Sequence, residues 1–500
     1  MSTQIGESLL FELSRPGRCG VELPESDVPI VDLGILMPSA DFREDLPLPE
    51  VAEPAVIRHY THLSQRNYSI DSGFYPLGSC TMKYNPKINE EAARIQGFAR
   101  LHPLIEDKHA QGALQVLFEM QQMLAEIGGM DSCSLQPAAG AHGELLGLML
   151  IKAYHADNGN GEIKDTILVP DAAHGTNPAS AARCGYKTIA VKSNARGRVD
   201  LDHLKSLVNE RVAGIMLTNP NTLGLFEDHI DEIAALVHGV GGLLYCDGAN
   251  MNALVGRARP GDMGFDVMHY NLHKTFSTPH GGGGPGSGPV AVKKHLAPYL
   301  PSPMVVQGDD GTYSLDHDRP KSVGKLATYW GSFMAILRAY VYIRYYGSNK
   351  LAQIAENAVL NANYIRVSLQ NTLDVAYNEL CMHECIFSAR KQQRAHGTKA
   401  YDIAKRLMDY GYHPPTIYFP LIVPEALMIE PTETENRETL DAFVEAMQSI
   451  LREAEESPEL LTSAPTTTPV RRLDEATAAR QPCLRWSCDV DIDEPAGAAA

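Results

Sequence analysis

The stretch Val267-Met-His-Tyr-Asn-Leu-His-Lys-Thr-Phe-Ser277 places a lysine directly behind a short apolar run. Its first four residues are typical of a buried β-strand, so we expect Lys274 just past the end of that strand, partly removed from water. Desolvation disfavours the ammonium form of a lysine, and the neutral amine is the form that makes a Schiff base. For a lysine considered alone, an ordinary surface position is the simpler interpretation, so the surrounding sequence has to decide.

A glycine-rich run, Gly281-Gly-Gly-Gly-Pro-Gly-Ser-Gly288, follows this lysine. It contains the formal spacing G-x-G-x-x-G, but Pro285 interrupts it, and no acidic residue follows at the distance expected for a ribose contact. We therefore interpret the run as a loop whose backbone approaches a ligand closely, and not as a dinucleotide-binding motif.

An acidic residue ends the apolar run Leu243-Leu-Tyr-Cys-Asp-Gly-Ala249. In an open α/β sheet, ligands bind at the carboxyl ends of the strands. An aspartate there can keep a pyridinium nitrogen protonated, which makes the ring an electron acceptor. Taken alone, Asp247 would equally suit the cap of a following helix, but Lys274 behind the next strand favours the ligand.

A loop of small residues, Gln136-Pro-Ala-Ala-Gly-Ala-His-Gly-Glu144, opens a helix that is expected to run through Leu150. Free backbone N–H groups and the helix dipole favour a phosphate at such a place. A tight junction between loop and helix is an equally good interpretation of the loop alone. His142 has two possible uses, stacking on a flat ring or capping the helix.

A second polar loop, Asp171-Ala-Ala-His-Gly-Thr-Asn-Pro-Ala-Ser180, also follows a predicted strand and opens a helix. Its side chains at His174, Thr176 and Asn177 suit contacts to a cofactor hydroxyl or a substrate carboxylate. The alternative is a simple turn built around Asn177 and the proline after it.

Short apolar runs alternate with helical patterns through the middle of the chain. The predicted strands are residues 166–169, 188–191, 214–217, 243–246, 267–270 and 290–292, and the predicted helices are 111–127, 142–154 and 229–237. This alternation predicts an α/β fold whose mostly parallel sheet carries helices on both faces.

The pattern differs at both ends of the chain. Residues 1–60 are expected to form an extended arm, because prolines between positions 16 and 54 leave little room for regular structure. Residues 61–325 would form the large α/β domain, 326–480 a smaller α+β domain, and 481–500 a tail. Within the smaller domain we expect long helices over 329–370, helices at 399–410 and 437–455, and strands at 381–389 and 425–430.

Composition excludes several classes of protein. Hydrophobic residues make up 44% and charged residues 21% of 500 residues, which suits a globular chain with two domains. The net charge of −18 disfavours nucleic acid and anionic membranes as partners. The apolar runs are too short to cross a bilayer, and the first twenty residues do not resemble a secretory signal or transit peptide, so a cytoplasmic location is expected.

The nine cysteines are scattered and odd in number, which suits a reducing compartment and not a disulfide framework. The sequence Cys381-Met-His-Glu-Cys385 has the residue types of a metal site, but no second Cys/His pair follows at zinc-ligand spacing. We interpret it as a buried strand with small thiols and predict no metal.

Together these motifs resemble the P-protein family of the glycine cleavage system, in particular the second subunit of its two-subunit form. The resemblance covers nearly the whole chain. Beyond the stretches already quoted, it rests on residues 58–64, 74–83, 217–224, 360–364 and 413–420, and on the full run 271–289. Ser287 and Trp330 depart from the family pattern, where Ala and Tyr are expected.

The resemblance implies a fold-type I pyridoxal-phosphate-dependent transferase, similar to aspartate aminotransferase. It implies that Lys274 forms the Schiff base with pyridoxal 5′-phosphate and that Asp247 faces the pyridine nitrogen. Ala249 would pack on one face of the ring and His142 on the other. The remaining positions that it assigns to the pocket are Gly140 and Ala141 near the phosphate, and His174, Thr176 and His273.

The implied reaction is the decarboxylation of glycine, with release of CO2 and transfer of the aminomethyl group to the lipoyl arm of H-protein. Because the family's single-chain form has about twice this length, the resemblance also implies a separate subunit 1 and an α2β2 assembly. One alternative is an aminotransferase or another amino-acid decarboxylase, with Arg390 or Arg394 holding a substrate carboxylate. The other is a structural subunit whose partner holds the cofactor, against which the intact Lys274 and Asp247 argue.

Overall fold

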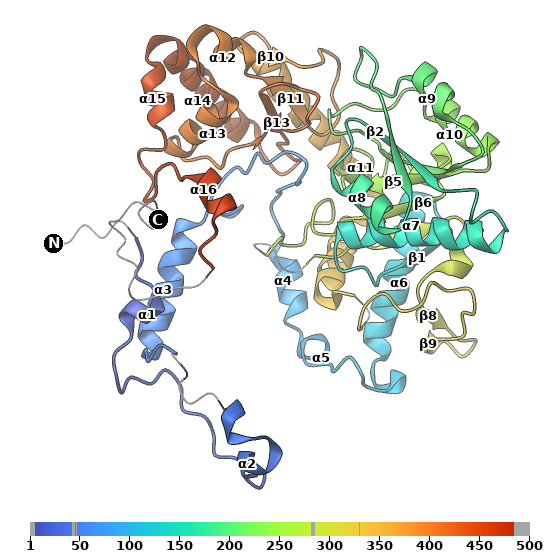
Figure 1. Cartoon of the computed structure of the whole chain (residues 1–500), viewed down its shortest axis with the longest axis vertical. Coiled ribbons are helices and arrows are strands. Elements are labelled where there is room, and N and C mark those ends of the chain that lie inside the picture. Colours follow the sequence, from blue (N-terminus) through green and yellow to red (C-terminus); the bar gives the residue numbers. More distant parts are fainter. Residues whose placement is uncertain (1–5, 43–45, 47, 282–285, 330, 485–500) are drawn as a thin grey trace. The chain divides into compact units, whose positions relative to one another are not determined.

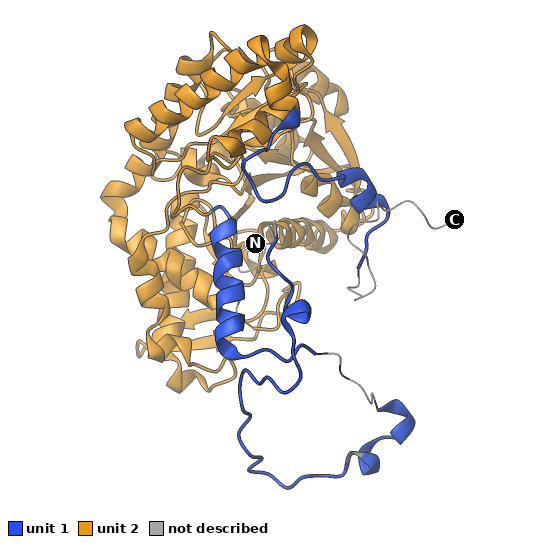
Figure 2. Ribbon diagram, turned by 90° about the vertical axis from the view of Figure 1, so that its left-hand side faces the viewer, with its two compact units in different colours: residues 1–68, 463–500 blue, residues 69–462 orange. Residues whose placement is uncertain are grey.

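The computed structural model describes residues 6–42, 46, 48–281, 286–329 and 331–484, and it divides into two units (Figure 2). Unit 1 comprises residues 1–68 with 463–500, and unit 2 comprises residues 69–462. Trp330 and residues 282–285 of the glycine-rich run lie outside the described residues.

Unit 1 contains helices joined by extended chain, and the extended arm over residues 1–60 stays a prediction. Its helices are α1 (Leu10–Leu13), α2 (Leu33–Leu36), the 3-10 turn η1 (Ser39–Asp41), α3 (Glu53–Arg66) and α16 (Glu475–Arg480). Hydrogen bonds tie the segment before α3 together: Gly17 N–H donates to the Glu50 carboxylate at 2.6 Å, Arg15 N–H donates to the Glu50 carbonyl at 3.1 Å, and Glu50 N–H donates to Ser14 Oγ at 2.9 Å.

A seven-stranded sheet forms the centre of unit 2 (Figure 1). Its strands, in spatial order, are β1 (Ser132–Ser134), β7 (Val290–Val292), β6 (Val267–Tyr270), β5 (Leu243–Gly248), β4 (Val212–Thr218), β2 (Thr166–Pro170) and β3 (Lys187–Val191). Strands β2 to β6 are parallel, and β7 is antiparallel to both of its neighbours. The six strands predicted from the apolar runs and their mostly parallel arrangement are thus confirmed.

Helices cover both faces of this sheet, also as predicted. One face packs on α7 (Gly140–Asp157) and α8 (Thr176–Arg183), and the other on α6 (Gln111–Gly128) and α10 (Ile230–Gly239). Neighbouring residues of β4 alternate between these layers, since Ile215 belongs to the α6/α10 core and Met216 to the α7 core. Each fully buried aliphatic side chain of this kind contributes about 1.5–3 kcal/mol.

A smaller four-stranded antiparallel sheet lies in the C-terminal part of unit 2. Its order is β10 (Asp374–Val375), β11 (Cys385–Ser388), β13 (Ala426–Ile429) and β12 (Thr416–Ile417). The helices of this part are α11 (Phe333–Leu369), α12 (Arg390–His396), α13 (Ala400–Asp409), α14 (Arg437–Glu456) and α15 (Pro458–Ser463). Gly347, at φ 65°, interrupts α11 and divides it into two helices. The expected small α+β part is therefore present, while the domain boundaries at 60, 325 and 480 stay predictions.

The first segment of unit 2 runs from the small sheet to the large one. Leu77 pairs with Ile429 of β13, and Gly78 packs so closely on Met428 that a side chain would not fit.

The other elements of unit 2 are α4 (Lys87–Ala93), α5 (Gln96–Ala99), α9 (Leu201–Leu207), the hairpin β8 (Met304–Gln307) and β9 (Tyr313–Asp316), and four 3-10 turns, η2 (Asp107–His109), η3 (Met251–Ala253), η4 (Pro260–Met263) and η5 (Ala297–Tyr299). Among the described helices, none is both long and apolar enough to cross a bilayer.

Candidate active site

The loops that carry the predicted site residues meet at one edge of the large sheet. Parallel strands end at the same edge, so β5 delivers Asp247 there, β6 leads to Lys274 and β2 leads to His174. The amino end of α7 arrives at the same edge, because the position where Gly140 would carry a Cβ lies against the Asn271 side chain. The topology therefore gathers residues that are far apart in the sequence.

Asp247 is buried and held by three groups. Its Oδ1 accepts from the N–H of Ala249 at 3.0 Å, its Oδ2 accepts from Asn177 Nδ2 at 3.0 Å, and His269 Nε2 lies 3.4 Å from Oδ1. Burial alone would raise the pKa of Asp247, but the interaction with His269 and the bond from Asn177 outweigh burial and lower it. A carboxylate that stays ionised in a dry site can hold a protonated ring nitrogen.

His269 supports this aspartate from the strand beside it. Its Nδ1 lies 2.7 Å from the hydroxyl of Tyr245, whose pKa is raised by burial, so the tyrosine keeps its proton and donates it. The ring proton of His269 then belongs on Nε2, which faces Asp247. His269 was not predicted as a site residue, although it stands within the stretch that carries the lysine.

Lys274 lies half-buried, and its Nζ donates to the carbonyl oxygen of Ser79 at 2.7 Å. Ser79 has a left-handed backbone, φ 63°, which is uncommon for a residue with a side chain. Its Oγ lies 2.8 Å from His174 Nε2, so this one serine contacts two of the predicted site residues. Ser79 belongs to the 74–83 run on which the family resemblance rests, but its contact with Lys274 was not foreseen.

Thr176 and Asn177 reach a second buried carboxylate, Glu144. Thr176 Oγ1 and Asn177 Nδ2 donate to the two oxygens of Glu144, each at 2.9 Å. Burial and the neighbouring charge of Asp247 raise the pKa of Glu144 to about 7. Asn177 bridges the two carboxylates with the two hydrogens of its amide, so the interpretation of residues 171–180 as a simple turn is incomplete.

The backbone donors at the amino end of α7 have no capping side chain among the described residues. Ala139, before the first helical residue, is extended (φ −156°, ψ 167°), and no side chain caps the helix. Gly288 lies so close to the carbonyl of Ala139 that a Cβ would not fit, so the glycine-rich run approaches this helix end directly. Such an end suits an anion, and the phosphate role of Gly140 and Ala141 stays a prediction.

His142 and His273 lie near this helix end as neutral rings. His142 Nδ1 accepts from the N–H of Ala138 at 3.2 Å, and burial lowers the pKa of this histidine. His273 Nδ1 accepts from the N–H of Ser287 at 3.4 Å, and burial together with His280 lowers the pKa of His273 to about 3. His142 thus contacts the backbone just before the helix, and its stacking role stays a prediction.

Buried polar atoms without a partner indicate that this edge is built for a ligand. Among the described residues, those around Lys274 that lack a hydrogen-bond partner include Asn271 Oδ1, Thr275 Oγ1, Thr278 Oγ1, His280 Nε2 and Ser287 Oγ. Leaving one such group unpaired costs about 1–3 kcal/mol. A ligand with several oxygen atoms and an aromatic nitrogen, such as pyridoxal 5′-phosphate, fits this set together with Lys274 and Asp247.

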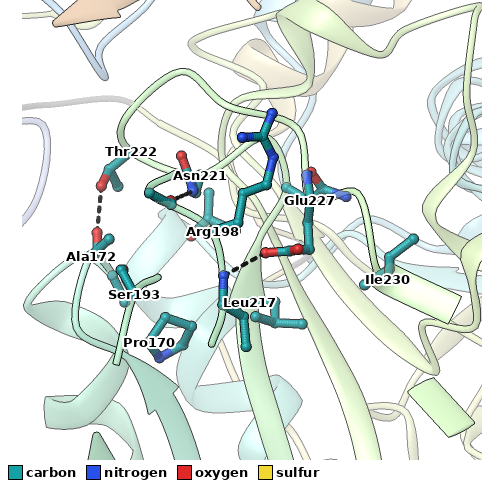
Figure 3. A pocket seen from close by; sticks show the side chains of 14 residues that line it. Pro170, Ala172, Ser193, Arg198, Leu217, Asn221, Thr222, Glu227 and Ile230 are labelled. Carbon is teal, nitrogen blue, oxygen red and sulfur yellow. Dashed lines mark hydrogen bonds between the residues drawn. The ribbon is translucent and has the colours of Figure 1, made fainter. Parts of the chain in front are cut away.

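A separate pocket opens nearby, at the carboxyl ends of β2 and β4 (Figure 3). It lies between Ala172, Arg198, Asn221 and Glu227 and is partly open to solvent, and the described residues that line it include neither Lys274 nor Asp247. Glu227 accepts from the N–H of Val199 at 2.8 Å, so its carboxylate is used to join the two loops around the pocket. This pocket therefore lacks the lysine and the aspartate for which a role with the cofactor is predicted.

The predicted strand at 381–389 is shorter in the structure. β11 begins at Cys385, while residues 381–384 turn so that His383 and Glu384 are buried beside Glu430 at the end of β13. An apolar run predicts burial well, but a strand needs a partner for each backbone N–H and C=O, and β13 ends opposite Cys385.

Comparisons with known proteins agree with one another. A family model described as "Glycine cleavage system P-protein" matches residues 39–316, and one described as "Glycine dehydrogenase, C-terminal domain" matches residues 354–467. A relative from Bacillus velezensis is 57% identical over 97% of this chain and 98% of its own length, and one from Halalkalibacterium halodurans is 58% identical over 96% and 98%. Both are described as "Probable glycine dehydrogenase (decarboxylating) subunit 2".

Solved structures share the fold. An inhibitor-bound glycine decarboxylase (P-protein) of the glycine cleavage system superposes with a TM-score of 0.71 at 22% identity, covering 84% of this chain and 94% of the other. A cysteine desulfurase from Escherichia coli superposes with a TM-score of 0.58 at 17% identity, covering 79% and 98%. The predicted fold-type I architecture of pyridoxal-phosphate-dependent enzymes is confirmed.

Proposed function

This chain belongs to the glycine cleavage system P-protein family and is an enzyme that decarboxylates glycine, and we propose that it does so at Lys274 with pyridoxal 5′-phosphate as cofactor. The observation that carries the proposal is that Lys274 and the ionised, buried Asp247 lie at the same edge of the sheet, where the charge of Lys274 helps to lower the pKa of Asp247. When bound, the cofactor would supply an aromatic ring that accepts the electron pair released with CO2.

The residues of this chain would divide the work as follows. Asp247, steadied by Asn177 and His269, would hold a proton on the ring nitrogen. The N–H groups of Gly140 and Ala141 would bind the phosphate, and Ala249 and His142 would enclose the ring. His174, Thr176 and His273 would complete the wall of the pocket and exclude water, which strengthens each charge interaction inside it.

We propose the lipoyl arm of H-protein as the acceptor of the aminomethyl group and a subunit 1 as the partner in an α2β2 assembly. The two relatives' description as "subunit 2" supports a two-subunit enzyme. We also propose a cytoplasmic location, which the eight free cysteines among the described residues support.

The aminotransferase alternative is less well supported. Arg390 and Arg394, which would hold a substrate carboxylate, are both exposed on α12. A carboxylate-binding arginine is expected to be shielded from water, because its charge then acts in a lower dielectric.

The test joins a chemical and a kinetic measurement. Borohydride reduction of the loaded chain, followed by peptide mass spectrometry, should place the cofactor on Lys274. The second measurement is exchange of labelled bicarbonate into glycine, with subunit 1 and lipoylated H-protein present. Exchange should be lost in Lys274→Ala. It should fall by about 10²-fold or more in Asp247→Asn, because asparagine would no longer hold the proton on the cofactor's ring nitrogen.

The matched control is Lys164→Met, which changes a buried lysine at the opposite edge of the same sheet, where Nζ donates to the carbonyl of Val212 at 3.1 Å. It should keep both the label on Lys274 and the exchange. Label on another lysine would refute the cofactor site. Correct labelling without exchange in the unaltered protein would refute the acceptor or the assembly proposed here.

A further inference from the structure

Two buried glutamates meet beside the lysine from the two central strands of the small sheet. Glu384 immediately precedes β11 and Glu430 immediately follows β13, and the register pairs Cys385 with Ile429, so the two carboxyl groups stand opposite each other. Their residues are 2% and 0% exposed. Two like charges this close in a dry environment cannot both be maintained without large cost, so the pair is expected to keep a proton.

A third polar group faces the pair and has no other use in the structure. His383 is 1% exposed, and neither of its ring nitrogens has a hydrogen-bond partner among the described residues. Its Nε2 lies 3.7 Å from Glu384 Oε1, and one nitrogen of His383 lies within 4.8 Å of an oxygen of each glutamate. Burial, reinforced by the charge of Lys274, lowers the pKa of His383 to about 3, so the ring is neutral and leaves the proton on the glutamate pair.

The hydrogen bonds show which glutamate carries the proton. Glu430 accepts from the N–H of Thr81 at 3.0 Å, from Thr81 Oγ1 at 2.5 Å and from Asn250 Nδ2 at 3.3 Å, whereas the single donor to Glu384 among the described residues is the N–H of Ser79 at 2.8 Å. Donors stabilise an ionised carboxylate, so Glu430 is the charged partner. Burial and the Glu430 charge raise the pKa of Glu384 well above its usual range, while burial raises that of Glu430 to about 7.

One residue connects this pair to the lysine. The N–H of Ser79 donates to Glu384, and the carbonyl of the same residue accepts from Lys274 Nζ. Ser79 and Thr81 both have left-handed backbones, with φ of 63° and 46°. Such conformations cost about 1–3 kcal/mol each and persist where surrounding contacts impose them, and here the two glutamates provide those contacts.

We propose that Glu384 and Glu430 hold one proton between them next to Lys274, and that this is the proton taken up when the aminomethyl group is transferred to a disulfide. The second half of the proposal rests on the function proposed above. The bond between the carboxyl carbon and the α-carbon of glycine breaks, and its electron pair forms a bond from the α-carbon to one sulfur. The S–S bond breaks with its pair on the other sulfur, which needs one proton to become a thiol. Each turnover therefore consumes one proton, and Glu384 holds one at the site.

Other titratable groups around the pair fix the direction of its pH dependence. Lys274 favours the charged form of both glutamates, whereas negative charge at Cys381, at the start of the 381–385 run, favours the protonated form of Glu384. Burial raises the pKa of Cys80, so this thiol stays protonated. The proton on the pair is thus present at neutral pH and is lost as pH rises through the titration of Glu384, so the rate of transfer should fall with increasing pH.

Infrared difference spectroscopy on the full chain without cofactor tests the shared proton directly. The spectrum should contain the carbonyl band of a protonated carboxylic acid at neutral pH, and this band should weaken in Glu384→Gln. In Glu430→Gln it should titrate at lower pH, because the neighbouring negative charge is gone. The control is Glu435→Gln: burial alone raises the pKa of Glu435 to about 7, so this variant should remove a separate acid band.

Kinetics test the use of the proton. Glutamine at position 384 can still accept from Ser79 but cannot give up an acidic proton, so cofactor absorbance should be kept while transfer to lipoylated H-protein falls by about 10²-fold or more. Glu435→Gln should transfer at the unaltered rate. The proposal is overturned if neither pair variant changes the acid band, or if Glu384→Gln transfers normally. Absence of transfer in the unaltered protein would instead refute the proposed function and leave the infrared result to decide the shared proton.

Discussion

Replacing Lys83 by methionine should destabilise unit 2 far more than an ordinary lysine substitution. Lys83 is 3% exposed, and its Nζ donates to Glu433 at 2.7 Å, to Asn252 at 3.0 Å and to Tyr342 at 3.1 Å. Methionine fills nearly the same volume, so packing is kept while the charge and its three hydrogen bonds are removed. Glu433 then stays buried without its cation.

The structure sets the size of this effect. Removing one partner of a buried ion pair costs about 3–5 kcal/mol. Glu433 retains Asn252 Nδ2 at 3.1 Å and the hydroxyl of Tyr342 at 3.2 Å as donors, which places the expected loss at the lower end, about 3 kcal/mol. The double variant Lys83→Met/Glu433→Leu, which removes both charges, should recover most of this loss.

The control is Lys87→Met, four positions further along the chain. Lys87 pairs with Asp71 at 2.6 Å, but both side chains are 55% exposed, so the loss should be at most about 1 kcal/mol. Urea unfolding monitored by circular dichroism measures each change in the free energy of unfolding, as the shift of the midpoint urea concentration multiplied by the m-value. The reasoning about the buried charge is wrong if Lys83→Met lowers the free energy of unfolding no more than Lys87→Met does. It is also wrong if the double variant is less stable than Lys83→Met alone.

Two further outcomes follow from packing and titration. Gly147→Ala should lower the free energy of unfolding by about 1–3 kcal/mol in the same assay, because the new Cβ would collide with the buried Tyr245 ring. Gly112→Ala, where a Cβ on α6 meets open space, should not lower it. His238 lies 2.8 Å from Asp266, whose hydrogen bond raises the pKa of the histidine. This stabilisation is complete below about pH 6.5 and is lost as pH rises through the histidine's pKa in the folded state, so His238→Asn should flatten the stability–pH curve there.

The sequence predicted the large sheet well because its strands are buried on both faces. Runs such as 214–217 and 243–246 are continuously apolar, and β4 and β5 lie where those runs stand. β1 was not predicted, because three residues of the pattern Ser-Cys-Ser carry no recognisable period. Its place is fixed by pairing with β7, which comes more than 150 residues later.

The sequence also predicted which functional residues stand just after the ends of strands. Lys274 and Asp247 were predicted to lie together because parallel strands end at one edge, and the structure places both there. Their cofactor roles remain predictions. The supports of Asp247 were harder to foresee, since Asn177 and His269 are ordinary polar residues until tertiary structure turns their side chains toward the carboxylate.

The sequence by itself therefore determined the order of strands and helices, the family and the two residues at the centre of the site, because these depend on periodicity and on motifs within single stretches. Only the tertiary structure decided what surrounds Lys274. Ser79, Glu384 and Glu430 come from segments up to about 350 residues apart in the chain, and their roles arise from burial and mutual distance. Whether a carboxyl group keeps its proton depends on the charges and donors beside it, which no single stretch of sequence contains.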